Sequence, residues 1–273
     1  MTEAIITAGE IAASISGARL EGDGRTPVAG LCTDARKARG GVLFVGLKGE
    51  RFDGTDFAVQ AAEAGAAALL VSRRVPVKGA AQIIATDTGR AFCESAAAWR
   101  SRFAIPVIAV CGSNGKTTTT QMIAAILREA FGEEGRLATE GNFNNSVGVP
   151  ITLWRLRACH KAAVIEAGMS HPGEMAELAA MIRPTVALVN NAQREHQEFL
   201  PDVAATAREN AFAIRALGPE GVAVYPADDA CADIWRAAAG GRRTVTFSTT
   251  PGVAADVMAE VRPHGDGIAV RLS

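Results

Sequence analysis

The sequence predicts an α/β protein in which a small N-terminal α/β domain precedes a domain built on a doubly wound, mostly parallel sheet. Short apolar runs alternate with helical segments, which is typical of parallel sheets covered by helices. One predicted strand leads directly into a glycine-rich loop that opens a helix. The chain has 273 residues, of which 48% are hydrophobic and 21% charged, so it is large enough to bury two cores.

The first domain is predicted over residues 1–104. Its strands and helices are expected at 42–47, 58–63, 68–71 and 86–103. The last of these segments has apolar residues at helical spacing, and it ends at Pro106, because the residue before a proline disfavours helix. We therefore place the domain boundary between residues 104 and 105.

The second domain is predicted over residues 105–273. Helical segments separate its predicted strands, which is the pattern of a parallel sheet covered on both faces. These strands are expected at 107–111, 162–167, 186–190, 222–225 and 244–247. The final stretch, 255–273, predicts a strand pair that turns around residues 264–267. It stops at a strand without a closing element, so we expect this domain to be truncated.

Composition excludes several classes of partner. The formal net charge of −1 gives no long-range attraction to nucleic acid or to an anionic membrane. The five cysteines are widely spaced and form no Cys-x-x-Cys pair, which argues against disulfides and zinc and favours free thiols in a reducing compartment. The N-terminus has no basic residue before Arg19 and no long apolar run, as a signal peptide or membrane anchor would have. We expect a monomeric cytoplasmic protein.

A phosphate-binding loop is the strongest signal from the residues alone. Glycines let successive N–H groups point at phosphate oxygens, Lys116 can reach the terminal phosphates, and the hydroxyl of Thr117 can ligate Mg²⁺. The loop is shorter than the general Walker pattern, because Gly112 lies only three residues before Gly115. ATP and Mg²⁺ are the predicted cofactors. The predicted nucleotide-binding residues are Gly112, Ser113, Asn114, Gly115, Lys116, Thr117 and Thr118.

Two further strands deliver polar side chains to the same sheet edge. Glu166 ends the strand at 162–167, and the strand at 186–190 is followed by Asn190, Asn191 and His196. Ligands of doubly wound folds bind at the carboxyl ends of parallel strands, so Glu166 and His196 are candidate metal ligands. A solvated strand cap and an exposed loop histidine are the alternatives. The amide-rich run at 141–145 predicts a turn.

Four stretches of the second domain resemble the Mur ligase family in order and spacing. They are Cys-Gly-Ser-Asn-Gly-Lys-Thr-Thr at 111–118, Gly-Asn-Phe-Asn-Asn at 141–145, Glu-Ala-Gly-Met-Ser-His-Pro-Gly-Glu at 166–174 and Val-Asn-Asn-Ala-Gln-Arg-Glu-His at 189–196. The asparagine run favours the MurF branch. In the first domain, Thr-Asp-Ala-Arg at 33–36 and Lys-Gly-Glu-Arg-Phe-Asp-Gly at 48–54 resemble that branch's uridine-diphosphate pocket. The resemblance thus covers nearly the whole chain.

The resemblance implies an ATP-dependent ligase of peptidoglycan precursor synthesis. Such an enzyme transfers the γ-phosphate of ATP to the carboxylate of UDP-N-acetylmuramoyl-tripeptide, and D-alanyl-D-alanine then attacks the acyl phosphate. Lys116 would hold phosphates, Thr117 and Glu166 would ligate one Mg²⁺, and His196 a second. The residues implied to bind the UDP-sugar peptide are Asp34, Arg36, Phe52, Asp53, Asn142, Asn144 and Asn145.

The chain departs from the family pattern at three positions. The family places a carbamylated lysine about a dozen residues after the metal-binding histidine, but this chain has no lysine after Lys161. With a shift of one residue, Glu209 falls near that position, and we hypothesise that its native carboxylate replaces the carbamate. A solvated helix residue is the alternative for Glu209. Ala35 replaces a usual serine of the uridine pocket, and Pro226 replaces an asparagine that often helps to hold adenine.

The third domain of the family has no counterpart after Phe247, so we expect this chain by itself to bind substrates better than it catalyses. Two rival functions are open at this point. One is a neighbouring Mur ligase that adds the third amino acid, and the other is a non-catalytic module that binds UDP-muramyl peptides. A generic phosphate-loop phosphotransferase is disfavoured by the shortened loop and by the motifs of the first domain.

Overall fold

The computed structural model describes residues 5–49, 52–194, 198–264 and 267–273, and it divides into two compact units. The first unit comprises Met1–Arg102 together with Leu153–Arg155, and the second comprises Phe103–Thr152 and Leu156–Ser273. The mixed α/β architecture with mostly parallel sheets confirms the predicted fold class.

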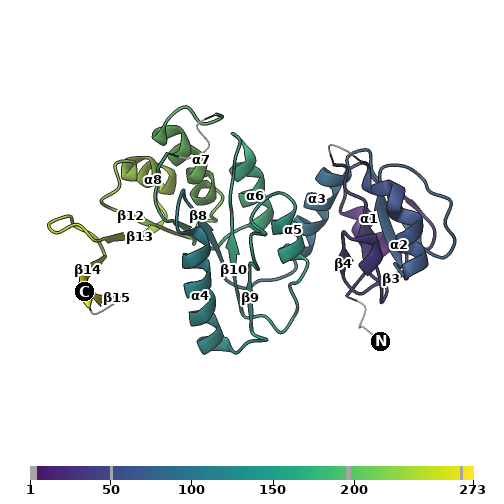
Figure 1. The fold of residues 1–273 in the computed structure, drawn as a ribbon, viewed down its shortest axis with the longest axis horizontal. Helices are drawn as coiled ribbons and strands as arrows, with labels where there is room; N and C mark the ends of the chain where they lie inside the picture. Colours follow the sequence, from purple (N-terminus) through teal and green to yellow (C-terminus); the bar gives the residue numbers. More distant parts are fainter. Residues whose placement is uncertain (1–4, 50–51, 195–197, 265–266) are drawn as a thin grey trace. The chain divides into compact units, whose positions relative to one another are not determined.

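The first unit contains a five-stranded sheet of order β2-β7-β6-β5-β4, in which only the β2–β7 pair is antiparallel. A separate antiparallel pair joins β1 to β3. Its elements are β1 (Ile6–Thr7), α1 (Ala8–Ala13), β2 (Arg19–Glu21), β3 (Pro27–Val28), β4 (Leu31–Cys32), η1 (Ala35–Lys37), β5 (Leu43–Val45), η2 (Gly54–Phe57), α2 (Ala58–Ala64), β6 (Ala68–Val71), β7 (Ala81–Ile84) and α3 (Thr88–Arg100) (Figure 1).

The core of the first unit lies between its sheet and its helices. Strand residues such as Phe44 and Leu69 pack with the alanines of α2 in one buried cluster. On α3, the indole of Trp99 stacks on that of Trp154, with ring centroids 5.6 Å apart. The tripeptide Leu153–Arg155 therefore completes this core from a distant part of the sequence.

The second unit contains an eight-stranded sheet of order β15-β14-β13-β12-β11-β8-β10-β9. All neighbouring pairs are parallel except β14–β15. Its elements are β8 (Val107–Cys111), α4 (Lys116–Phe131), β9 (Arg136–Ala138), α5 (Gly148–Leu153), β10 (Ala162–Glu166), α6 (Glu174–Ile182), β11 (Val186–Val189), α7 (Val203–Arg215), β12 (Val222–Pro226), α8 (Ala232–Ala239), β13 (Arg243–Ser248), β14 (Val257–His264) and β15 (Gly267–Leu272) (Figure 1).

The strand order creates a switch point at β8. The chain passes from β8 to β9 at one edge, returns through β10, and then continues on the other side of β8 with β11. Alternate strand residues face opposite sides of a sheet, and Val110 and Val164 pack under α4 while α6 and α7 contact β8. The carboxyl ends of β10, β8 and β11 are therefore neighbours, which is where doubly wound folds bind ligands.

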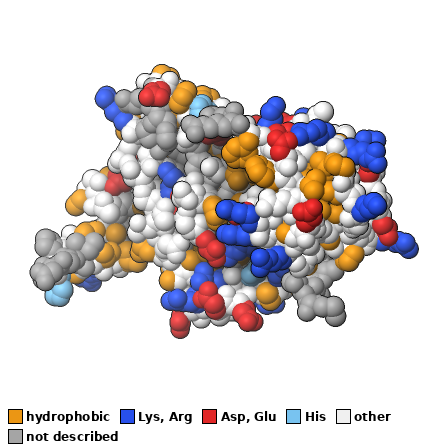
Figure 2. All heavy atoms as spheres, turned by 45° about the vertical axis from the view of Figure 1, so that its right-hand side comes forward, with side chains coloured by type: hydrophobic (Ala, Val, Ile, Leu, Met, Phe, Trp, Pro, Cys, Tyr) orange, Lys and Arg blue, Asp and Glu red, His pale blue; other side chains and the backbone are white. Residues whose placement is uncertain are grey.

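The five strands predicted for the second domain, the helix at 58–63 and the final hairpin are all present, with ends shifted by at most two residues. The sequence reading missed the edge strand β9 and the short helix α5, which are too brief to show a period. None of the helices in the described part of the chain combines the length and apolarity needed to cross a bilayer. Basic and acidic side chains are interspersed over the face drawn in Figure 2.

Candidate functional site

The phosphate loop lies at the carboxyl end of β8, as predicted. Gly115 has a left-handed φ of 79° and caps α4, so the chain turns directly into a 16-residue helix. The first amides of a helix have no intrahelical partner and attract anions. The N–H groups of Lys116, Thr117 and Thr118 stand at this position. They are the backbone donors that the fold presents to a phosphate.

The three loop amides before Gly115 are bound within the protein. The N–H of Gly112 donates to Oδ1 of Asn210 at 3.1 Å, and that of Asn114 donates to Oδ1 of Asn191 at 3.0 Å. The N–H of Ser113 donates to the carbonyl of Asn191 at 3.2 Å. We expected successive amides of the whole loop to point at phosphate. In this structure that role falls to the amides at the start of α4, because those of 112–114 are bound within the protein.

Lys116 is folded back over its own loop. Its Nζ donates to the carbonyls of Gly112 and Ser113 at 2.7 and 3.0 Å. A lysine can exchange carbonyl oxygens for the more strongly attracting oxygens of a phosphate, because its flexible stem carries a compact charge. The Lys116 side chain, which is predicted to hold phosphates, thus lies against the first two residues of the loop.

The end of β11 is hydrogen-bonded to the phosphate loop. Nδ2 of Asn190 donates to the carbonyl of Asn114 at 3.2 Å and to Oγ1 of Thr119 at 3.0 Å. Nδ2 of Asn114 donates to Oε1 of Gln193 at 2.6 Å. A Cβ on Gly112 would lie 3.0 Å from the backbone N of Asn190, so only glycine allows this approach. These contacts confirm that the end of β11 converges on the loop.

Glu166, at the end of β10, lies beside the loop with its side chain buried to 1% exposure. Its Oε1 accepts hydrogen bonds from the hydroxyl of Thr117 at 3.2 Å and from Nδ2 of Asn144 at 2.8 Å. Among the described residues, its Oε2 is buried without a hydrogen-bond partner. A buried carboxylate oxygen without a partner is costly, so the solvated-cap alternative does not hold.

The donor set around Glu166 fits Mg²⁺. A carboxylate and a threonine hydroxyl are hard oxygen ligands, and Mg²⁺ binds proteins through one or two such groups while keeping several waters. In the part of the chain that the structure describes, no cluster of three His, Cys, Asp or Glu side chains forms a complete metal cage. Thr117 and Glu166 would hold such an ion together with phosphate oxygens. His196, the predicted ligand of a second ion, lies outside the described residues.

The three asparagines of the amide-rich run have different environments. Asn144 is held between Glu166 and the N–H of Gly168, which donates to its carbonyl at 2.8 Å. Oδ1 of Asn145 accepts the N–H groups of Val147 and Gly148 at the start of α5. Asn142 is exposed. The structure thus places one residue of the predicted substrate-binding run, Asn144, in hydrogen-bond contact with Glu166, the predicted metal ligand.

Glu209 lies on α7 and is only 7% exposed, so the alternative of a solvated helix residue is wrong. Its Oε1 accepts the N–H of Gly173 at 2.7 Å and that of Met175 at 3.3 Å. These amides belong to the start of α6. The carboxylate of Glu209 is therefore engaged with a helix N-terminus, where the helix dipole favours a negative charge.

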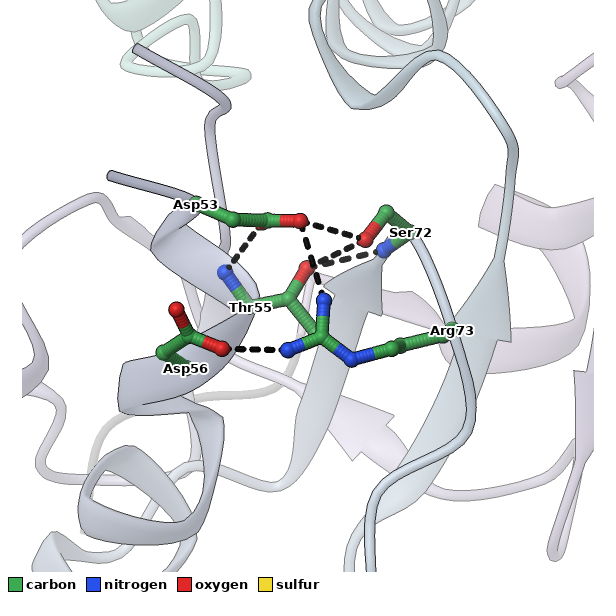
Figure 3. A network of polar contacts seen from close by, with 5 residues as sticks. All are labelled: Asp53, Thr55, Asp56, Ser72 and Arg73. Atoms are coloured by element: carbon green, nitrogen blue, oxygen red, sulfur yellow. Dashed lines mark hydrogen bonds and ion pairs between the residues drawn. The ribbon is translucent and has the colours of Figure 1, made fainter. Parts of the chain in front are cut away.

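In the first unit, the predicted substrate residue Asp53 lies in a polar network (Figure 3). Its carboxylate accepts from the N–H of Thr55 at 2.8 Å, the hydroxyl of Ser72 at 2.9 Å and Nη1 of Arg73 at 3.0 Å. Burial raises the pKa of Asp53, but the hydrogen bonds from Thr55 and Ser72 and the charge of Arg73 outweigh it, so the pKa is lowered. A carboxylate accepts about four hydrogen bonds, so Asp53 has room for about one more.

The other predicted uridine residues lie near the surface of the same unit. Asp34 caps η1 and forms a two-pronged ion pair with Arg36, with both N···O distances 2.9 Å. The hydrogen bond from the Arg36 side chain lowers the pKa of Asp34. The ring of Phe52 is 61% exposed and meets Phe57 edge-to-face. An exposed aromatic ring is a surface on which a base can stack.

Sequence reasoning missed several residues that complete these sites. Their signals are weak, because each is a common polar residue far in sequence from its partner, and three of the four lie just after the end of a strand. Thr139, for example, accepts the backbone N–H of Glu166 at 2.9 Å. The missed residues are Ser72, Arg73, Thr139 and Asn210.

The second unit is thus a phosphate-loop nucleotide-binding domain, with the loop at its switch point and a buried carboxylate beside it. Residues 110–273 match the family model for the Mur ligase middle domain, and residues 27–110 match that for the Mur ligase catalytic domain. The chain belongs to the Mur ligase family.

Curated ligases of the MurF branch match most of this chain. The chain is 43% identical over 216 residues to the UDP-N-acetylmuramoyl-tripeptide–D-alanyl-D-alanine ligase of Escherichia coli, covering 79% of this chain and 47% of that protein. The corresponding Bacillus subtilis ligase is 39% identical over 208 residues, covering 75% of this chain and 45% of the relative. The chain thus spans about half the length of the curated relatives it matches.

Solved structures agree with this assignment. A crystal structure of MurF from Acinetobacter baumannii superimposes with a TM-score of 0.88 at 32% identity, covering 98% of this chain and 58% of that one. A UDP-N-acetylmuramoyl-L-alanyl-D-glutamate–2,6-diaminopimelate ligase has a TM-score of 0.61 at 20% identity, covering 99% of this chain and 57% of that chain, and this likeness shows a shared fold alone.

Proposed function

We propose that this chain supplies the UDP-sugar-binding and ATP-binding parts of a ligase that joins D-alanyl-D-alanine to UDP-N-acetylmuramoyl-tripeptide in peptidoglycan precursor synthesis. The 43% identity to the Escherichia coli ligase supports this reaction. The observation that carries it is the pairing of a phosphate loop with the buried, half-satisfied carboxylate of Glu166. We further propose that the protein acts as a cytoplasmic monomer.

The chemistry needs activation because a carboxylate and an amine do not condense in water. The peptide carboxylate of the substrate attacks the γ-phosphorus of ATP, ADP leaves, and the amine of the dipeptide then displaces phosphate from the acyl phosphate. The protein contributes positioning and charge stabilisation. Lys116 and the amides at the start of α4 bind the phosphates. Mg²⁺ held by Thr117 and Glu166 would neutralise charge on the phosphate oxygens.

The substrate side of the reaction is assigned to the first unit and to the run at 141–145. Asp34, Arg36, Phe52 and Asp53 offer charge, hydrogen bonds and an exposed ring to a uridine diphosphate. Asn142 is exposed and its amide can contact the muramyl peptide. His196 is proposed as a ligand of a second Mg²⁺.

Calorimetry tests this proposal directly. The chain is titrated with UDP-N-acetylmuramoyl-tripeptide and, separately, with ATP and Mg²⁺, and Lys116→Ala serves as the nucleotide control. We expect both ligands to bind and the variant to lose nucleotide affinity alone. Binding of ATP without any affinity for the UDP-sugar peptide contradicts the cell-wall assignment and leaves a generic phosphate-loop protein.

A further inference from the structure

Helix α7 carries two buried polar residues in succession, and each binds the backbone of a different loop. Oε1 of Glu209 accepts the N–H groups of Gly173 and Met175 at 2.7 and 3.3 Å. Oδ1 of Asn210 accepts the N–H of Gly112 at 3.1 Å. Their exposures are 7% and 1%. One helix therefore contacts both the start of the phosphate loop and the start of α6.

The loop fastened by Glu209 is the one that follows Glu166. The segment 167–173 connects that carboxylate to α6. Near Glu166 it is fixed by the N–H of Gly168 donating to the carbonyl of Asn144 at 2.8 Å. At its far end, Oε2 of Glu174 accepts the N–H of Ser170 at 2.6 Å. Glu209, which is 36 residues away in the sequence, binds the same end of the loop through the N–H of Gly173.

We propose that Glu209 is a positioning residue which acts through the hydrogen bonds it accepts from α6, and which together with Asn210 sets the loop after Glu166 against the phosphate loop. This inference rests on the proposed function, since Mg²⁺–ATP is what the two loops would hold. It differs from the hypothesis that Glu209 replaces a carbamylated lysine. That hypothesis requires the negative charge of Glu209, whereas the positioning role requires only an oxygen that accepts hydrogen bonds.

Glutamine separates the two hypotheses, because it keeps the oxygen acceptor and the shape of glutamate but removes the charge. We expect Glu209→Gln to bind Mg²⁺–ATP within about twofold of the unchanged protein. Glu209→Ala should weaken binding by about tenfold, the lower end of what loss of an orienting partner costs at metal sites. If the charge were required, Glu209→Gln would lose as much affinity as Glu209→Ala, and the proposal would be overturned.

Amide hydrogen exchange at Gly173 and Met175 gives a readout that does not depend on ATP. We expect Glu209→Ala to speed exchange at both amides by at least about tenfold, because their acceptor is gone, and Glu209→Gln to leave it near the original rate. Glu177→Ala is the matched control, since Glu177 is also an acidic residue in the first turn of α6 but is exposed. It should change neither rate.

The two readouts also separate this inference from the proposed function. A chain that binds no ATP refutes the function, while the exchange rates still decide whether Glu209 holds α6. Unchanged exchange in Glu209→Ala would overturn the positioning role even if ATP binds. If Glu209→Ala does not fold, the comparison of Glu209→Gln with the unchanged protein decides both questions.

Discussion

Asp53 in the first unit is half-buried and Glu166 in the second is almost fully buried, and their hydrogen-bond partners also differ. Asp53 accepts three hydrogen bonds, including one from the guanidinium of Arg73, and uses both of its oxygens. Glu166 receives two hydrogen bonds on a single oxygen, and its other oxygen has no partner among the residues the structure describes. Arg73 provides a positive charge for the first carboxylate, whereas one oxygen of the second has no hydrogen-bond partner among the described residues.

We infer from this difference that Asp53 stabilises the fold in addition to its proposed contact with uridine diphosphate, whereas the charge of Glu166 serves the proposed metal site. Burying an ion without a partner is unfavourable, so natural sites that keep such a charge give up stability for function. Asp53 joins η2 to the residues after β6 through Ser72 and Arg73, so its replacement should lower the free energy of unfolding. Replacement of Glu166 should lower the affinity for Mg²⁺–ATP.

The largest expected effect is on Mg²⁺–ATP binding in Glu166→Gln. The neutral amide cannot replace a carboxylate ligand, so we expect affinity in the presence of Mg²⁺ to fall by about 100-fold or more. The midpoint of thermal unfolding should stay the same or rise, because the unpaired buried charge is gone. Retained affinity measured by calorimetry would show that the ion is held elsewhere.

Asp53→Ala should give the opposite result. It removes the cap of η2 and takes one hydrogen-bond acceptor from Ser72 and one from Arg73, although Ser72 keeps its contact with Thr55 and Arg73 its ion pair with Asp56, so we expect the free energy of unfolding to fall by about 2 kcal/mol. Urea denaturation measures this change, and ATP affinity should remain the same. Asp56→Ala is the control, since its exposed ion pair with Arg73 is worth at most about 1 kcal/mol. Equal losses in both variants would contradict the assigned role of Asp53.

A smaller effect is expected at Asn144, whose amide orients Glu166. Asn144→Ala should lower the apparent affinity for Mg²⁺ in the presence of ATP by about tenfold, equivalent to about 1.4 kcal/mol. The exposed neighbour Asn142 provides the control, because Asn142→Ala should leave this dependence intact. A titration of Mg²⁺ at fixed ATP compares the two variants, and identical curves would remove Asn144 from the metal site.

The smallest effect concerns pH. The folded state lowers the pKa of Asp53 below its unfolded value of about 3.9. A lowered pKa contributes stability that is fully present above about pH 4 and is lost as the pH falls through the folded value. Urea unfolding between about pH 5 and 3 should therefore show a steeper decline for the unchanged protein than for Asp53→Asn. Parallel curves would show that another carboxyl controls the decline, such as Asp228, whose pKa is also lowered.

Features formed by neighbours in the sequence were predictable from it. The order of strand, glycine loop and helix at 107–131 located the phosphate loop, because each part is a local pattern with its own residue preferences. Glu166 was found for the same reason, as the residue that ends a strongly apolar strand. The position of His196 in the site stays a prediction.

Only the tertiary structure decided which polar side chains meet. The side-chain amide of Asn144 donates a hydrogen bond to Glu166, which is 22 residues away in the sequence. Asn210 accepts one from the N–H of Gly112, which is 98 residues away. Glu209 could equally have faced solvent from an amphipathic helix, as far as its sequence neighbours tell. Local propensity sets where helices and strands begin and end, but a hydrogen bond between distant residues depends on strand order and helix packing, which no short stretch of sequence encodes.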